Sequence, residues 1–580
     1  MEAAGIRYSG ITMPKNGISL LRSLLFITLS CTLHFNVALS SNTVVSVTLL
    51  NDTAISTGGC ASGPPSSCNL RSAIAYCATV LTQSLDLCSI HLPSGATVYV
   101  DVQLYGTIDV SVSSGQLLVY GNKSQIFSSA GVELLSDIPT LSVHDTGSEF
   151  SLTISDLSWT GLGGKTVRGG VLYLKATSNI VLQNITFDSN IGKLGAGIYA
   201  EAAVDVRLLQ CSFLDNNVTN HGAAVYLSSQ CSDWSVEHSR FYHNQADQDG
   251  TVYISASTHR ITIDTTHFLS NTALGRGGGL RVDSYSDDVV LRECILDGNE
   301  AIDGGAIYFD KSSSAMSIMN SSFVGNRAPR SGGAVYVSDT MTRLVVSGST
   351  FKQNFAQMGA ALYINSFMAY LVVTNSSFLS NVAEFNGGAI YMHQYSNLCS
   401  FSTCLFDNNT AYNGAALYSY QSNSYMTITD CVFSGQNGGY WGGALYIGEY
   451  HNYWSILDCS FIDNSAVLGS SVFIYSTNYN VDLTRCSFLR NLAEMGGGVA
   501  VYGLNYNVNV DSCSFRGNVA TKGGGGMCVG TSASAVNVVN TSFVENYATS
   551  TGGAFTTSGA VYSISFIGCN FTRNKSGRLG

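Results

Sequence analysis

A tetrapeptide, Phe-x-x-Asn, recurs along this chain at a nearly constant interval and constrains the fold more than any other sequence feature. Thirteen copies occur, and Leu296 and Phe433 fill the two gaps, with Asn299 and Gln436 in the fourth position. The resulting 15 registers are 26 to 28 residues apart. They begin at Phe187, Phe213, Phe241, Phe268, Leu296, Phe323, Phe351, Phe378, Phe406, Phe433, Phe461, Phe488, Phe515, Phe543 and Phe571. A degenerate earlier register is predicted at Leu157.

Two further segments complete each repeat. A Gly-Gly-Ala-aliphatic-Tyr motif follows each register, as in Gly304 to Tyr308, and a stretch of alternating apolar and polar residues precedes the next Phe. These segments are short, rich in β-branched and aromatic residues, and separated by Gly and Asn, which excludes helical repeats. Stacked coils bury an interior that no single coil can bury alone. We therefore predict an all-β, right-handed parallel β-helix with three strands per coil of about 27 residues.

The motif residues have structural interpretations in such a fold. The Phe side chains should form an interior stack, and each Asn amide should bond the equivalent amide one coil away. The paired glycines should provide positive φ or close backbone approach at a corner. Gly277 to Gly279 and Gly523 to Gly526 are therefore interpreted as repeat corners and not as phosphate-binding loops.

The N-terminal region has a different organisation. Residues 1–40 resemble a signal peptide, because basic residues precede the apolar stretch from Leu24 to Leu29. A small-x-small pattern favours cleavage before Ser41. The alternative is a signal anchor that is not cleaved. Residues 41–100 are predicted to form a cap with a helix over 69–85, whose apolar residues have helical spacing. Four cysteines in this cap, Cys60, Cys68, Cys77 and Cys88, allow three disulfide pairings. The β-helix is expected over 101–580, regular from about 157–187 onward.

Secretion to the exterior or to a cell surface agrees with further features. No later stretch is long and apolar enough to span a bilayer. Ten N-glycosylation sequons occur, which matter only in a eukaryotic secretory pathway. They are Asn51, Asn122, Asn184, Asn217, Asn320, Asn375, Asn408, Asn540, Asn570 and Asn574.

Composition narrows the partners. Charged residues make up 11% of the chain and the formal net charge is −11. With no cluster of Lys and Arg, a nucleic-acid groove is not expected.

A column of cysteines lies two residues before the register Phe in five successive coils, Cys404, Cys431, Cys459, Cys486 and Cys513. Cys211, Cys294 and Cys569 share this position, and the other coils place Ser or Thr there, apart from Ile185 in the first. Stacked Cβ atoms would lie about 4.8 Å apart, beyond the separation of a relaxed disulfide. We favour buried thiols acting as small apolar side chains; export to an oxidising compartment favours disulfides instead.

The paired Phe-x-x-Asn and Gly-Gly-Ala motifs resemble those of the polymorphic outer-membrane protein family. The resemblance covers residues 157 to 580 and implies a β-helical surface adhesin. Cys68 to Ile74 also resembles the Cys-Ser-Leu-Arg-Glu-Ala opening of many secreted β-helices, with Ser72 in place of Glu. The resemblance does not extend to that family's membrane-embedded translocator, so it does not give the mode of anchoring. The sequence identifies neither the ligand nor the source organism.

Polysaccharide cleavage is the enzymatic alternative, since β-helices include pectate lyases and polygalacturonases. Such sites need clustered carboxylates with Arg or Lys nearby. The candidate carboxylates are the pair Asp287 and Asp288 and the pair Asp247 and Asp249. His221 is a further candidate, but the sequence shows no fixed partner for it. We interpret them as turn or surface residues. No cofactor, zinc spacing, phosphate loop or nucleophile elbow is predicted.

Loop aromatics give the remaining functional signal. Asn-Tyr-rich tripeptides recur at coil spacing, and such residues suit recognition, although a stack that only strengthens a corner is the alternative. The candidate binding face comprises Tyr440, Trp441, Tyr453, Trp454, Tyr479 and Tyr506. The predicted function is adhesion or surface scaffolding through cell-surface glycans or proteins. Carbohydrate binding without turnover is the second hypothesis, and a lyase or hydrolase is the third.

Overall fold

The computed structural model describes residues 42–46, 72–74, 76–77, 87–91, 97–100, 108–110, 114–128, 139–144, 146, 149–533 and 535–577. The signal peptide, Asn51, Cys60 and Cys68 lie outside these residues. The chain divides into two compact units, 1–267 and 268–580.

Unit 1 begins with irregular coils and becomes regular toward its end. Parallel pairing joins β1 to β2, β2 to β5, β5 to β7, and β7 to β9. These strands are β1 (Asn42–Ser46), β2 (Leu87–His91), β3 (Thr97–Val100), β4 (Ile108–Val110), β5 (Ser114–Ser128), β6 (Leu141–His144), β7 (Glu149–Thr160), β8 (Leu172–Lys175) and β9 (Ser178–Asp188). Phe187, Phe213 and Phe241 then stack with ring centroids 4.7 Å apart at each step.

The start of the repeat differs from the sequence prediction. Leu157 pairs with Ile185, whereas Trp159 lies opposite Phe187 and is the earlier register residue. Leu162 occupies the Asn position of that register and donates its backbone N–H to Asn190 at 2.9 Å. The wrong assignment follows from the motif itself, because an indole replaces the phenyl ring and an aliphatic residue replaces the amide.

Only part of the predicted cap is described. Residues 72–74 and 76–77 are helical, and Cys77 forms a disulfide with Cys88. Of the three ways to pair the four cysteines, this bond agrees with the one that joins Cys77 to Cys88. The capping role of the helix stays a prediction.

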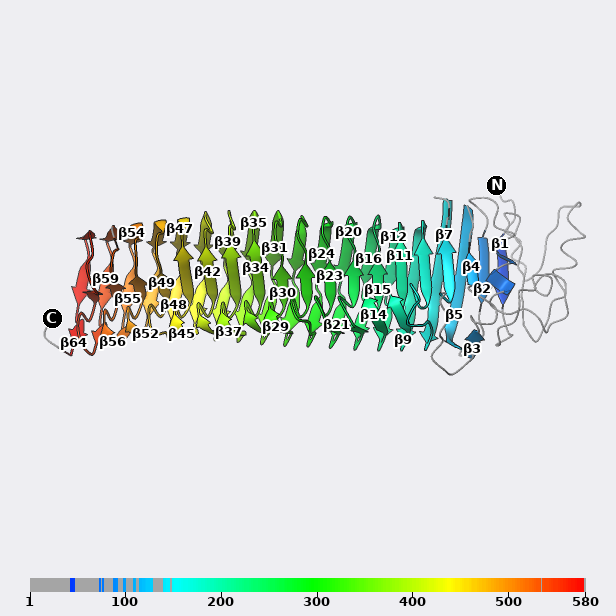
Figure 1. The fold of residues 1–580 in the computed structure, drawn as a ribbon, viewed down its shortest axis with the longest axis horizontal. Coiled ribbons are helices and arrows are strands. Elements are labelled where there is room, and N and C mark those ends of the chain that lie inside the picture. The colour runs from blue at the N-terminus through cyan, green and yellow to red at the C-terminus, as the bar shows by residue number, and fades with distance from the viewer. Residues whose placement is uncertain are drawn as a thin grey trace, which may run out of the picture. The chain divides into compact units, whose positions relative to one another are not determined.

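Each regular coil of unit 2 has three faces, as predicted, but the first face consists of two strands. In one coil, β35 (Tyr370–Thr374) and β36 (Ser377–Leu379) form the first face, β37 (Val382–Asn386) the second, and β38 (Ile390–Gln394) the third. Asn375, between the two strands of the first face, has φ +48° and bends the chain there. Figure 1 shows the same order of strands repeating through the green, yellow and red parts of this unit.

The interior of unit 2 is built from the register residues. Ten rings, from Phe323 to Phe571, stack with centroid distances of 4.5 to 5.0 Å. Phe378, near the middle, is completely buried. The interior aromatic stack is therefore confirmed.

The predicted Asn ladder is also present. Asn381 accepts hydrogen bonds from the backbone N–H and Nδ2 of Asn354, at 3.1 and 2.9 Å. Its own Nδ2 donates to the Phe351 carbonyl and to Asn409 Oδ1, each at 3.0 Å. Because Asn381 has no exposed surface, these bonds satisfy an amide that water does not reach.

The two glycines of a corner have different roles. Gly387 has φ +65°, which L side chains rarely adopt. At Gly388 a Cβ would lie 2.4 Å from the Ala415 carbonyl oxygen of the next coil. The first glycine is therefore needed for its left-handed backbone conformation, and the second is needed because a side chain there would clash with the next coil.

Candidate functional site

An exposed group of eight aromatic side chains and one leucine lies at one corner of unit 2, where the third face of one coil turns into the first face of the next. We call it the aromatic corner. Its members are 40 to 53% exposed. They are Phe367, Tyr370, Tyr395, Leu398, Tyr425, Tyr450, Tyr453, Tyr479 and Tyr506. The strands that enter and leave this corner are β34 (Leu362–Ser366), β35, β38, β39 (Ser400–Ser402), β42 (Leu417–Gln421), β43 (Met426–Thr429), β46 (Leu445–Glu449), β47 (Asn452–Leu457), β49 (Val472–Ile474), β50 (Tyr479–Thr484), β53 (Val499–Val501) and β54 (Tyr506–Asp511).

Parallel pairing places these rings in rows. Tyr425 stacks on Tyr453 at 5.0 Å, and Tyr479 stacks on Tyr506 at 4.9 Å. On the other side of the corner, Phe367 stacks on Tyr395 at 5.0 Å. The corner therefore presents near-parallel rings at the spacing of the coils.

A second buried polar ladder forms the floor of the corner. Asn423 donates its backbone N–H to His451 Nδ1 at 2.9 Å, and His451 donates its own to Asn478 Oδ1 at 2.9 Å. Asn478 continues the ladder to Asn505 at 3.1 Å, and Trp454 Nε1 donates to the Asn423 carbonyl at 2.8 Å. All five side chains are fully buried, so the backbone that carries the rings is fixed from below.

Burial keeps the imidazole in this ladder neutral. It lowers the pKa of His451 to about 3, although the Ser419 carbonyl beside Nε2 favours the charged form. A neutral ring can accept at Nδ1 from the Asn423 N–H, which the charged ring cannot do. His451 is thus a structural member of the floor.

The backbone conformation of the corner is unusual for bulky residues. Phe367, Tyr395, Leu398, Tyr425 and Tyr453 have φ between +51° and +56°, and Tyr450 has φ +60°. Other coils place residues such as Ser312, Asn480 and Asn507 at these left-handed positions. A large exposed ring is poorly suited to this region and gains little packing in return.

The aromatic corner is also almost uncharged. The segments 365–371, 393–399, 420–426, 448–454, 475–480 and 502–508 contain one charged side chain, Glu449. The equivalent segments of the three preceding coils contain seven, Asp283, Asp287, Asp288, Asp310, Lys311, Asp339 and Arg343. Charge is therefore excluded from the coils that carry the rings.

The structure divides the candidate binding face. Tyr453, Tyr479 and Tyr506 lie in the aromatic corner, 53, 40 and 40% exposed. Trp454 is completely buried beneath it, so it does not belong to an exposed face.

The other two members of the candidate face lie elsewhere. Tyr440 and Trp441 belong to β45 (Asn437–Trp441), which leads into the Gly-Gly corner at the opposite end of the third face. Trp441 packs there against Tyr446 and Phe473, with centroids 6.0 Å apart in each case. These two residues are therefore separate from the aromatic corner.

The earlier half of the aromatic corner was not predicted from the sequence. Phe367, Tyr370, Tyr395, Leu398 and Tyr425 precede the segment of highest aromatic density. Their signal was the coil spacing, since Tyr370, Leu398, Tyr425 and Tyr453 follow one another at 27- or 28-residue intervals. Aligning the coils by register would have found them.

The tyrosines of the Gly-Gly-Ala-x-Tyr motif form a different row, on the third face. Tyr363, Tyr391, Tyr418 and Tyr446 stack at 4.9, 5.2 and 4.3 Å and are only 4 to 6% exposed. Burial raises the pKa of Tyr363 to about 12. This row is packed too closely to offer a binding surface.

The carboxylates and histidine considered for catalysis remain dispersed. His221 does have a partner, which corrects the sequence interpretation, because its Nδ1 lies 3.6 Å from Asp249 Oδ2. Asp247 is exposed, and Asp288 has φ +53° at the start of β24 (Asp287–Arg292). Among the described residues, no group of three or more His, Cys, Asp and Glu side chains is arranged to hold a metal ion.

One carboxylate pair lies close to a buried cation. Arg281, 4% exposed, has Nη2 2.8 Å from Asp310 and 3.7 Å from Asp283, and its guanidinium lies 4.3 Å from the centre of the Tyr308 ring. Both carboxylates are directed to the same guanidinium, whereas glycoside cleavage needs two carboxyl groups that flank the scissile bond. The pair therefore suits structure better than catalysis.

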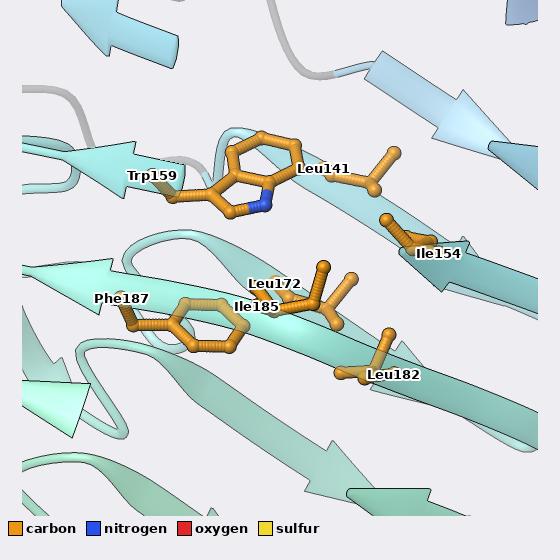
Figure 2. A pocket seen from close by; sticks show the side chains of 7 residues that line it. All are labelled: Leu141, Ile154, Trp159, Leu172, Leu182, Ile185 and Phe187. Atoms are coloured by element: carbon orange, nitrogen blue, oxygen red, sulfur yellow. The ribbon is translucent and has the colours of Figure 1, made fainter. Parts of the chain in front are cut away.

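An apolar pocket in unit 1 is unsuited to a polar ligand. Its lining comprises Leu141, Ile154, Trp159, Leu172, Leu182, Ile185 and Phe187. Figure 2 shows these side chains directed toward one another from neighbouring strands. All seven are at most 4% exposed, so the pocket is a packing gap beside the ring of Trp159.

The cysteine column is buried, and its thiols are free. Cys404, Cys431, Cys459, Cys486 and Cys513 are 0 to 3% exposed. Each lies at the corner between the two strands of the first face, and Cys404 Sγ donates to the Ser402 carbonyl at 3.3 Å. Ser321 makes the equivalent bond to Met319 at 2.8 Å. The thiol interpretation agrees with this arrangement, although the residues lie in corners and not within strands.

Four sequons share one position of the coil. Asn184, Asn320, Asn375 and Asn540 are exposed, with φ between +47° and +52°. The repeat favours Asn at this left-handed position and Ser or Thr just before the register Phe, so these sequons follow from the fold itself. Asn217, Asn408 and Asn570 are also exposed.

The remaining sequons differ. Asn574 is half-buried, and its Nδ2 donates to the Phe543 carbonyl at 2.7 Å. Asn122 lies in β5, and its side chain is outside the described residues. Glycosylation stays a prediction.

Comparison with known proteins identifies the fold family. The profile of the right-handed β-helix region matches residues 169–356 and 360–546. The chain belongs to the right-handed β-helix family. This confirms the predicted fold class, while membership of the polymorphic outer-membrane protein family is not shown. No curated protein matches the chain. No helix among the described residues is long and apolar enough to cross a membrane.

Several solved structures are similar to the chain at a low level. PfbA, a surface adhesin of Streptococcus pneumoniae, is 12% identical over 66% of this chain and 88% of its own, with a TM-score of 0.34. The tailspike protein of E. coli bacteriophage HK620, in complex with a pentasaccharide, is 14% identical over 76% of each chain, with a TM-score of 0.38. Likeness at this level carries no argument about function.

Proposed function

We propose that this chain is an extracellular attachment protein whose β-helix displays the aromatic corner to glycans or proteins of a cell surface. The observation that supports this most is the gathering of nine bulky side chains, 40 to 53% exposed, in six successive coils, with six of them held at left-handed φ. Such strained residues persist where the surrounding structure fixes them, and they concentrate at functional sites. A corner serving only stability would be better filled by Asn, Asp or Gly.

The floor of the corner supports the same proposal. A binding surface gains affinity when its side chains are held in place before the ligand arrives. The buried ladder from Asn423 to Asn505 fixes the backbone under the rings. Exposed apolar surface gathered at one place is also typical of interaction sites.

The test replaces Tyr453, Tyr479 and Tyr506 together with Ala. Attachment of protein-coated beads to cells should weaken by about tenfold or more, because a few aromatic residues dominate most interfaces. Tyr285→Ala is the matched control, since Tyr285 is 62% exposed with φ +60° but lies outside the six coils of the corner. Normal attachment by the folded triple variant would refute the proposal.

A second measurement separates attachment from catalysis. Incubation of the purified protein with polygalacturonate and calcium should release no unsaturated or reducing ends, because the acidic residues are dispersed or paired with Arg281. If such products appear, the attachment proposal fails and the Asp283 and Asp310 pair must be examined as a catalytic site.

A further inference from the structure

We infer that the ligand of the aromatic corner is an extended, uncharged glycan chain that lies lengthwise across successive coils. This inference rests on the proposed function and names its ligand class. Three independent properties of the corner carry it: its charge, its polar groups and its periodicity.

The charge of the corner excludes an ionic ligand. A polyanion needs Lys or Arg, and the six segments of the corner contain neither. A polycation would meet one carboxylate, Glu449. Basic and acidic side chains do occur on the same unit, as in the pair of Arg485 and Asp458, but on the first face away from this corner. The surface is thus suited to a ligand without net charge.

The chemical groups of the corner are those that bind sugars. The outward edges of the stacked phenol rings offer apolar contact area to the C–H groups of a pyranose, and their hydroxyls can donate or accept hydrogen bonds. Amides lie beside them: Asn507 is exposed, Asn452 and Asn480 are half-buried, and Asn507 Nδ2 donates to Asn480 Oδ1 at 2.7 Å. Rings and neutral amides together match a ligand made of hydroxyls and C–H groups.

The periodicity of the corner gives the orientation. Tyr370, Leu398, Tyr425 and Tyr453 occupy the same position of four successive coils, and Tyr425 stacks on Tyr453 at 5.0 Å. Tyr479 and Tyr506, which stack at 4.9 Å, hold the neighbouring position of the next two coils. This interval is close to the length of one sugar unit in an extended chain. Each of the six coils therefore offers one bulky apolar side chain at or beside this position, and a straight glycan can contact several of them at once. An extended glycan has such a repeat along its whole length, whereas the surface of a globular protein partner has not, so the corner favours the glycan.

The test measures binding as a function of chain length and charge. The probes are the trisaccharides and hexasaccharides of the cello, xylo and manno series, with hexagalacturonate as the charged comparison. At least one neutral hexasaccharide should bind about tenfold or more tightly than its trisaccharide, because it spans more linked subsites. Hexagalacturonate should bind more weakly than that neutral hexasaccharide.

The variant for this test is Tyr425→Asn with Tyr453→Asn. Asn is the residue of the neighbouring coils at the same position, Asn480 and Asn507, so the fold should persist. The double variant should bind the neutral hexasaccharide about tenfold more weakly, in the range expected for losing two aromatic contacts. Tyr285→Asn should bind normally, and unfolding midpoints should verify that all variants are folded.

The outcomes distinguish this inference from the proposed function. If no neutral hexasaccharide binds but bead attachment still depends on Tyr453, Tyr479 and Tyr506, the ligand is a protein, and only the inference is overturned. If binding is independent of length, or if hexagalacturonate binds as tightly, the lengthwise uncharged chain is also overturned. If bead attachment is independent of these tyrosines, the proposed function fails as well.

Discussion

Truncation of one amide in the interior ladder should destabilise the protein far more than its single side chain suggests. In Asn381→Ala, two donors of Asn354 and the carbonyl of Phe351 lose their side-chain partner. The site has no exposed surface, so water cannot replace the lost bonds. Each of these three buried polar groups left unsatisfied costs about 1–3 kcal/mol, which gives a total of about 3–9 kcal/mol.

Gln436 provides the internal comparison. It accepts from Asn409 at 3.2 and 3.1 Å, but its longer side chain turns its Nε2 to the Ser434 carbonyl at 2.8 Å instead of the next amide. Gln436→Asn should therefore complete the ladder to Asn464 and stabilise the protein by about 0.5–1.5 kcal/mol.

Urea unfolding followed by circular dichroism measures both changes, with amide hydrogen exchange at Asn354 as the local probe. Asn381→Ala should lower the unfolding midpoint and speed exchange at Asn354, and Gln436→Asn should raise the midpoint. A loss below about 1 kcal/mol for Asn381→Ala would refute the reasoning, because it would show that the buried amide is dispensable.

Three further predictions concern the interior. In the unfolded chain His451 has a pKa near 6.5, whereas in the folded protein its pKa is about 3, so only the unfolded chain binds the proton between these pH values. Lowering the pH from 7 to 5 should therefore remove about 2 kcal/mol of stability. His451→Asn should abolish this loss, and a variant with the same pH dependence of urea unfolding as the wild type would contradict the assignment. Phe378→Ala should cost about 3–5 kcal/mol, whereas Phe385→Ala, at a residue 52% exposed, should cost far less; equal thermal shifts would contradict the interior stack. The thiols of Cys404 through Cys513 should resist alkylation in the folded protein and react after denaturation without reductant, whereas recovery of disulfide-linked peptides from this column would overturn the free-thiol assignment.

The fold was predictable because the repeat places one residue type at the same position of every coil. Stacking then brings Phe378 onto Phe351 and Asn381 onto Asn354 without any knowledge of the loops. The register at Trp159 was not predictable from the motif, because its side chains match neither member of Phe-x-x-Asn. Pairing with Phe187 identifies it only in three dimensions.

The candidate site was predictable only in part. Tyr453 and Trp454 are neighbours in sequence, yet one ring is 53% exposed and the other is fully buried, because successive residues of a strand face opposite sides. The density of aromatic residues does not distinguish the two sides. Residues with left-handed φ also interrupt the alternation of inward and outward side chains along the chain. Thr403, with φ +54°, is one of them, and Cys404 therefore lies between two strands and not in the strand of Phe406.

The most direct test of the account is tyrosine footprinting of the protein while it is attached to cells. Exposed phenols are iodinated in the free and in the attached state, and the modified peptides are quantified by mass spectrometry. Tyr425, Tyr453 and Tyr479 should be protected on attachment, whereas Tyr285 and Tyr562, 62 and 74% exposed, should be iodinated equally in both states. Full iodination of the corner tyrosines in the attached protein, or equal protection at Tyr285, would contradict attachment through the aromatic corner.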